Sequence, residues 1–279
     1  MNIIPSSKDC VVGTCLLMCP PSEVRFRNEN HLIHQLESSQ SINSSSGRLI
    51  GDPQKMVKEY IRSAAGCSLL NPEILRPPTV LLTTIDYLLD LYRQMKLSQL
   101  TTVFSFVSDR LRAVRQDMIL QQPSPVDTMK ILQKMIPFYI ETDYFCKLHE
   151  CSAYDYKLHS TQIEECFSRW NEVVRQVPKD LVNPLIVCSY LMRRISEPSS
   201  MLEVYRWKSY LSVDLWTIVH SIVLCARSCN YSGFFRNLRR LPSGFTRAST
   251  VNAIICIRLR TLTLIGNYDF QFLFLNLLD

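Results

Sequence analysis

The chain has 279 residues, of which 47% are hydrophobic, and it carries a formal net charge of +6. This apolar content supports a substantial core and excludes a chain that is disordered throughout. Only seven glycines occur, no glycine-rich phosphate loop or GxSxG elbow is present, and no apolar run is long enough to span a membrane, so the sequence favours helices and lacks common enzyme and transmembrane signals.

Residues 1–53 are expected to form an irregular N-terminal segment. A short helix is predicted from Pro21 to Glu37. The polar run 38–53, which begins SSQSINSSSG, is typical of a loop. We therefore treat 54–279 as a helical domain that follows this segment.

Three helices are predicted between residues 54 and 121. The stretch QKMVKEYIRSAAG (54–66) places apolar side chains at the spacing of one helix face. The prolines in RPPTV suit the start of a second helix, which should end near Met95. A third helix should cover about 98–121.

Helix-start signals continue after residue 121. Ser124-Pro125-Val126-Asp127 resembles a capping box with proline at the first helical position, and the helix that it opens should reach Glu150 with a kink at Pro137. Thr161-x-x-Glu164 is read as a second capping box. The stripe that follows consists of Ile163, Phe167, Trp170, Val174 and Val177.

Two further helices are predicted towards the C-terminus, opened by Asn183-Pro184 and capped by Ser212. The resulting fold class is mostly α, with sequential helical hairpins that suit an α-solenoid or a bundle. No strict repeat period supports a simple tetratricopeptide array. The runs CIRLRTLTL and FQFLFLNLLD, near the end of the chain, could be strands of a small α/β element.

The stretch DRLRAVRQDM (109–118) carries an unusual density of charge between apolar runs. On a helix, Asp109 can meet Arg112, Arg110 shares a side with Asp117, and Arg115 flanks an apolar seam. These five residues are predicted to form a structural ion network that fixes helix positions. A contact with a ligand or with RNA is the alternative.

Seven arginines and no acidic residue lie between Leu215 and Tyr268. Such a charge asymmetry predicts an anionic partner for this third of the chain. The stretch FFRNLRRLPSGFTR interleaves aromatic residues with arginines, as surfaces that bind single-stranded nucleic acid do. We assign Arg236, Arg239, Arg240 and Arg247 as candidate nucleic-acid contacts, with a merely solvated basic face as the alternative.

A zinc or thiol site is the remaining chemical hypothesis. Cys10, Cys15 and Cys19 lie near His31 and His34, but their spacing is not the paired C-x2-C pattern of zinc knuckles. Buried free thiols are the favoured interpretation. We expect no catalytic residue, cofactor, metal or small-molecule substrate, and a metal- or thiol-dependent enzyme is kept as an outsider.

Four ordered motifs together resemble the SAC-three/GANP family of helical scaffold proteins. GTCLLMCPPSEVRFR (13–27) is similar to its opening signature, and VKEYIRSAAG (57–66) to the motif that follows. LRPPTVLLTTIDYLL (75–89) and DRLRAVRQDM match two further elements. Weaker similarities continue to about residue 265, so the resemblance covers nearly the whole chain.

The resemblance implies a fold, partners and a location. The family fold is a helical array similar to PCI domains that ends in a winged helix, and this chain would hold a reduced or truncated form of that end. Large members scaffold the TREX-two mRNA export complex at the nuclear pore, with a PCI-domain protein and a small acidic DSS/Sem-type protein. RNA is a further partner, and no member is known as an enzyme.

Short members of the family imply the alternative function, which is centrosome duplication or spindle assembly. The expected locations are accordingly the nucleus, on the pore side of its envelope, and the cytoplasm, with the centrosome as a further site. By its length this chain resembles the short branch. The resemblance to the large members favours mRNA export as the first hypothesis.

Overall fold

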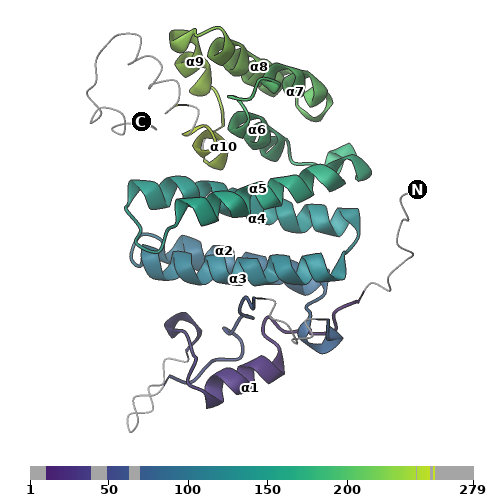
Figure 1. Ribbon diagram of the computed structural model, residues 1–279, viewed down its shortest axis with the longest axis vertical. Coiled ribbons are helices and arrows are strands. Elements are labelled where there is room, and N and C mark those ends of the chain that lie inside the picture. The colour runs from purple at the N-terminus through teal and green to yellow at the C-terminus, as the bar shows by residue number, and fades with distance from the viewer. Residues whose placement is uncertain (1–10, 39–48, 63–69, 243, 252–253, 255–279) are drawn as a thin grey trace. The chain divides into compact units, whose positions relative to one another are not determined.

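The computed structural model describes residues 11–38, 49–62, 70–242, 244–251 and 254 (Figure 1). Apart from one isolated bridge between Ser38 and Gly51, the regular secondary structure of these residues is helical. The mostly α class is thus confirmed. The PCI-like arrangement stays a prediction, and the two apolar runs expected to form the C-terminal element lie outside the described residues.

The chain divides into two compact units. The first comprises Met1–Met135 and Glu150–Asp155, and the second comprises Ile136–His149 and Tyr156–Asp279. The border falls within helix α4 (Pro125–Leu148), next to the predicted kink residue Pro137. In the described part of the chain, no helix combines the length and apolar character that crossing a bilayer requires.

The first unit is built around a helical hairpin. Helices α2 (Pro78–Met95) and α3 (Leu100–Gln121) lie side by side (Figure 1). The predicted apolar seam of α3 is fully or almost fully buried, and it consists of Val107, Leu111, Val114 and Met118. From α2, Leu81, Ile85 and Leu88 are buried as well. This seam makes α3 a rigid support for the N-terminal segments of the unit.

The predicted helix 21–37 is too long. Helix α1 covers Pro21–Glu29, and a separate 3-10 turn covers Gln35–Glu37. His31 lies between them with a φ of 58°, in the left-handed region that ends helices. The chain thereby folds back, so that the Arg27 guanidinium can donate to the Leu32 carbonyl, at 3.2 Å, and to Glu37.

The predicted helix 54–66 is wrong for the residues that the structure describes. Residues 56–62 have no helical structure, and 63–66 lie outside the described residues. Met56 and Val57 are fully buried, as the apolar pattern suggests, but in a segment without regular secondary structure. We call residues 56–62 the strap. Its backbone amides bond to side chains of other segments, which overrides the local helix preference.

The second unit is a succession of shorter helices. These are α5 (Tyr156–Val173), α6 (Pro184–Arg193), α7 (Ser200–Arg206), α8 (Val213–Arg227), α9 (Tyr231–Leu238) and α10 (Phe245–Ala248). Its core contains stacked indole rings, with the centroids of Trp170 and Trp207 5.2 Å apart. The stripe predicted from Ile163 to Val177 is buried throughout.

Three predicted helix starts are confirmed. The amide of Asp127 donates to Ser124 Oγ at 3.1 Å. Asn183 and Ser212 likewise accept from amides in the first turns of α6 and α8. These side chains satisfy amides that have no partner within the helix.

The capping box expected at Thr161 is wrong. Helix α5 already begins at Tyr156, and Thr161 Oγ1 donates to the Lys157 carbonyl one turn earlier, at 2.9 Å. A threonine in the helix interior often makes this bond. The sequence pattern alone does not distinguish it from a cap.

Replacing Ser124 with alanine should lower the free energy of unfolding by about 1 kcal/mol, because the cap is lost. Thr161→Ala is the matched control and should change stability by less than about 0.5 kcal/mol, since alanine is the better helix former. Urea unfolding of both variants measures this difference. Equal losses would contradict the assigned helix starts.

Candidate functional site

The Glu37 carboxylate is the centre of a buried ion cluster in the first unit. Its side chain is fully buried and pairs with the buried guanidinium of Arg27. Arg110, on α3, reaches the same carboxylate at 3.3 Å. The amide of Val57 adds a third donor at 2.9 Å. A buried carboxylate with this many donors is held in a single geometry.

Asp117 forms a second cluster, also on α3. Its fully buried carboxylate accepts from Lys58 Nζ at 2.6 Å and from Arg76 Nε at 2.7 Å. The Lys58 ammonium also donates to the Ile74 carbonyl at 2.7 Å. Asp117 therefore holds the strap and the segment before α2 against the same helix.

A side-chain amide extends this second cluster to the N-terminal segment. Gln121 Nε2 donates to the Arg76 carbonyl at 2.8 Å, and Gln121 Oε1 accepts from the Gly13 amide at 2.9 Å. Glycine is required at position 13, because a Cβ there would lie 2.3 Å from the Leu75 carbonyl oxygen. We refer to the Glu37 and Asp117 clusters together as the ion network.

The strap is held through its backbone. The amide of Glu59 donates to Glu23 Oε1 at 2.8 Å, and the amide of Tyr60 donates to Asp109 at 3.3 Å. Gln116 donates to the Ile61 carbonyl at 2.7 Å. Side chains from α1 and α3 thus form hydrogen bonds with the backbone of the strap.

The residues predicted from DRLRAVRQDM have partners different from those expected. Asp109 pairs with Arg110 at 2.6 Å rather than with Arg112. Arg112 lies over the ring of Tyr60, with 4.0 Å between guanidinium and ring centroid. Arg110 pairs with Glu37 and not with Asp117, and Arg115 is partly buried on the same helix.

Sequence reasoning missed the partners of this network on the N-terminal side. They are Glu23, Arg27, Glu37, Lys58, Glu59 and Arg76. The available signal was the presence of charged residues within otherwise apolar motifs. Spacing cannot pair such charges, because their partners lie up to 73 residues apart.

Burial shifts the pKa values of groups beside Glu37. Burial raises the pKa of Glu23, and the nearby Arg27 charge only partly offsets this effect. Burial also lowers the pKa of Arg27, but its hydrogen bond to Glu37 and the negative charges of Glu37 and Glu59 together outweigh that effect and leave the pKa raised. Arg27 therefore stays a cation, and the positive charges of the network are used within the fold.

The thiol of Cys19 is held in its protonated form. Cys15 and Cys19 are buried, and burial followed by the charge of Glu23 raises the pKa of Cys19 far above its usual range. A protonated thiol is a poor nucleophile and metal ligand. No group of three or more histidine, cysteine or acidic side chains suited to a metal gathers in the described part of the chain. Cys10 lies outside it.

The candidate nucleic-acid contacts gather at α9. This helix buries Phe234 and Leu238, whereas Arg236, Arg239 and Arg240 are exposed. Arg240 Nη1 donates to Asn237 at 3.1 Å. The side chain of the fourth candidate, Arg247 in α10, lies outside the described residues.

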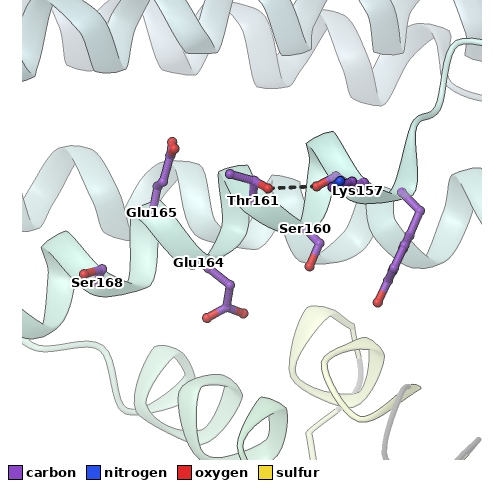
Figure 2. A pocket seen from close by; sticks show the side chains of 7 residues that line it. Lys157, Ser160, Thr161, Glu164, Glu165 and Ser168 are labelled. Carbon is purple, nitrogen blue, oxygen red and sulfur yellow. Dashed lines mark hydrogen bonds between the residues drawn. The ribbon is translucent and has the colours of Figure 1, made fainter.

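An open depression of about 500 Å³ follows one side of α5. Figure 2 shows Glu164 and Glu165 leaving the helix on different sides. Glu164 accepts from Arg193 at 3.0 Å and from Arg194 at 3.2 Å, which ties α5 to α6. All lining residues belong to this one helix, so the depression lacks convergent groups of the kind found in active sites.

The amino-acid sequence matches the model of a known protein family. The model of the SAC3/GANP family matches residues 18–265. The chain is 34% identical to "SAC3 family protein 1" of Schizosaccharomyces pombe over 133 residues, covering 46% of this chain and 12% of that protein. The residues matched by the family model include α3, which carries part of the ion network.

Two further relatives show similar partial coverage. "SAC3 family protein B" of Arabidopsis thaliana is 27% identical over 144 residues, or 52% of this chain and 8% of that protein. "Protein xmas" of Drosophila melanogaster is 27% identical over 159 residues, or 55% of this chain and 7% of that protein. The chain thus aligns with a small fraction of each relative.

Replacing Asp117 with alanine should lower the free energy of unfolding by roughly 3–5 kcal/mol, because it leaves Lys58 and Arg76 buried without their counter-charge. Asp90→Ala breaks an exposed pair with Arg93 and should cost less than about 1 kcal/mol. Denaturant titrations compare the two variants. A similar small loss in both would show that the buried cluster does not stabilise the fold.

His34 should make stability depend on pH. Burial and then the charges of Arg110 and Arg27 lower its pKa, against opposing effects of Glu37 and Glu59. The unfolded chain therefore binds the proton more readily than the folded chain. The stabilisation is present above the usual value of 6.5 and is lost as the pH falls through the lower folded pKa.

The test compares the free energies of unfolding of the native chain and of His34→Asn between pH 7 and pH 5. Asparagine keeps an acceptor for the Leu36 amide, to which His34 Nδ1 now bonds, but it does not titrate. The difference in the free energy of unfolding between the native chain and His34→Asn should decrease as the pH falls. A difference that stays constant would refute this role of His34.

Proposed function

Because this chain belongs to the SAC3/GANP family, we propose that it is a non-enzymatic helical scaffold of a nuclear mRNA export complex similar to TREX-two. The main support is the family match, which extends over most of the chain. The chain spans less than an eighth of the length of each relative described above. The identity of the complex, the partner proteins and the location in the cell are therefore proposed and are not carried over from these relatives.

The ion network supports a scaffold role. Its residues bind one another and the backbone, so they hold segments in place rather than act on a substrate. The second unit is a succession of helices with exposed apolar side chains such as Leu202 and Val213, which suit the binding of other proteins. The proposed partners are a PCI-domain protein and a small acidic DSS/Sem-type protein, in the nucleus.

Affinity capture of the tagged full chain from nuclear extract tests the complex. Recovery of a PCI-domain protein together with a DSS/Sem-type protein is the expected result, and a signal at the nuclear envelope should accompany it. Recovery of centriolar or spindle proteins in their place would contradict the export role and favour the centrosomal one.

The basic surface of α9 is the proposed RNA contact. Exposed arginines without acidic neighbours in sequence suit phosphate, and binding through phosphate weakens as salt is added. Phe234 and Leu238 fix α9 from its other side. Arg236 is therefore held on a packed helix, and Arg239 and Arg240 directly follow its end.

Replacing Arg236, Arg239 and Arg240 together with glutamate should weaken binding of single-stranded RNA by about tenfold or more at 100 mM salt, and it should flatten the salt dependence. The matched control replaces three other exposed cations, Arg25, Lys130 and Arg175, with the same change in net charge. Fluorescence anisotropy at several salt concentrations measures both. Equal losses in the two triple variants would show that only net charge matters.

A further inference from the structure

Helices α7 and α8 carry a group of exposed and half-buried apolar and aromatic side chains. We call it the α7–α8 patch, and it consists of Leu202, Tyr205, Val213, Trp216, His220 and Leu224. Exposed fractions are 62% for Leu202, 80% for Val213 and 48% for Leu224. The two helices contact each other within the second unit (Figure 1).

Helix α8 has apolar residues on two neighbouring stripes. Val219, Ile222 and Val223 are buried against the unit. Trp216, His220 and Leu224 follow one another at four-residue spacing, on a separate stripe of the helix. Trp216 and His220 of the second stripe are half-buried, whereas Leu224 and Val213 beside them are exposed, and apolar side chains grouped at the surface in this way indicate a binding surface.

The rings of the patch are held in place before any partner arrives. Trp216 and His220 are stacked, with their centroids 4.9 Å apart. The hydroxyl of Tyr205 lies 3.1 Å from His220 Nε2, and Trp216 Nε1 donates to the Val204 carbonyl at 3.3 Å. These contacts fix the orientation of the three rings, so binding would cost little conformational entropy.

The charges beside the patch are mainly positive. Lys208 Nζ lies 4.4 Å from the centroid of the Trp216 ring, and Arg227 is exposed at the end of α8. Glu203 is already paired with Arg206 at 2.6 Å. Asp214 is the acidic exception, and no acidic residue follows it before Asp269. This balance suits an acidic partner.

A protein segment fits these features better than a nucleic acid does. The Lys208 ammonium and the His220 imidazole cover ring surface of Trp216 that a nucleobase would need for stacking. The most exposed members of the patch, Leu202 and Val213, are aliphatic, whereas stacking on bases uses aromatic rings or arginine. Aliphatic anchors between cations are typical of protein interfaces.

We propose that the α7–α8 patch binds an acidic protein segment that carries aliphatic or aromatic anchor residues. The anchors would lie against Leu202, Val213 and Leu224, and the carboxylates would face Lys208 and Arg227. This docking site rests on the proposed scaffold role. It differs in position from the arginines of α9, which are assigned to RNA.

The test places a photo-crosslinking amino acid, p-benzoylphenylalanine, at Val213 of the full chain in cells. Leu97, which is 85% exposed in the other unit, receives the same amino acid as the control. Mass spectrometry then identifies the crosslinked peptides. Expected are peptides with a net negative charge and apolar side chains from Val213 but not from Leu97.

Two further sets of substitutions, each combined with p-benzoylphenylalanine at Val213, test which side chains contribute to binding. Leu202→Ser with Leu224→Ser removes exposed anchors, and Arg227→Glu reverses an exposed charge. Each set should lower the crosslink yield about tenfold or more. Ile119→Ser, on the exposed side of α3, is the matched control and should leave the yield unchanged. Melting temperatures verify that all variants are folded.

Crosslinks to RNA, to a second copy of the chain, to neutral or basic segments, or no crosslink at all would overturn the docking site. Unchanged yields in the Leu202/Leu224 and Arg227 variants would do so too. If affinity capture still recovers the export partners in those cases, the proposed scaffold function remains supported. Acidic crosslinks without export partners would instead sustain the docking site and remove the export role.

Discussion

Two buried carboxylates hold the first unit together. Glu37 lies in the 3-10 turn after α1, and Asp117 lies in α3. Glu37 and Asp117 have no contact with solvent, so each must be matched by donors or the fold loses several kcal/mol. Their donors come from α1, from the strap and from the segment before α2. Three stretches without long helices are thereby fixed to one rigid helix, which the buried seam of α3 positions. The helical hairpin alone would leave these stretches without partners.

This arrangement gives the family motifs a physical meaning. The opening motif supplies Arg27, the second supplies Lys58, the third supplies Arg76, and the fourth supplies Arg110 and Asp117. Motifs that are separate in sequence therefore form one network in space. A sequence that matches all four motifs in order contains these residues of the ion network. Such a match is therefore more informative than a match to any one motif.

The sequence predicted features that depend on neighbouring residues. The caps at Ser124, Asn183 and Ser212 and the seam of α3 follow from local spacing, and all are present. The strap was misassigned because its apolar spacing suits a helix equally well, whereas its structure depends on carboxylates from distant segments. For the same reason the sequence predicts a network of charges in DRLRAVRQDM but not the partners of these charges, which lie in distant segments.

The distances along the chain between these partners bear on how the protein is made. Asp117 lies 59 residues after Lys58, and Gln121 lies 108 residues after Gly13. The side-chain hydrogen bonds described for the second unit span shorter distances along the chain, with 20 residues between Tyr139 and His159 and 29 between Glu164 and Arg193. During synthesis, the N-terminal motifs leave the ribosome before α3 exists. They must wait, with their charges in water and their apolar side chains unprotected, until the chain has grown to nearly half its length.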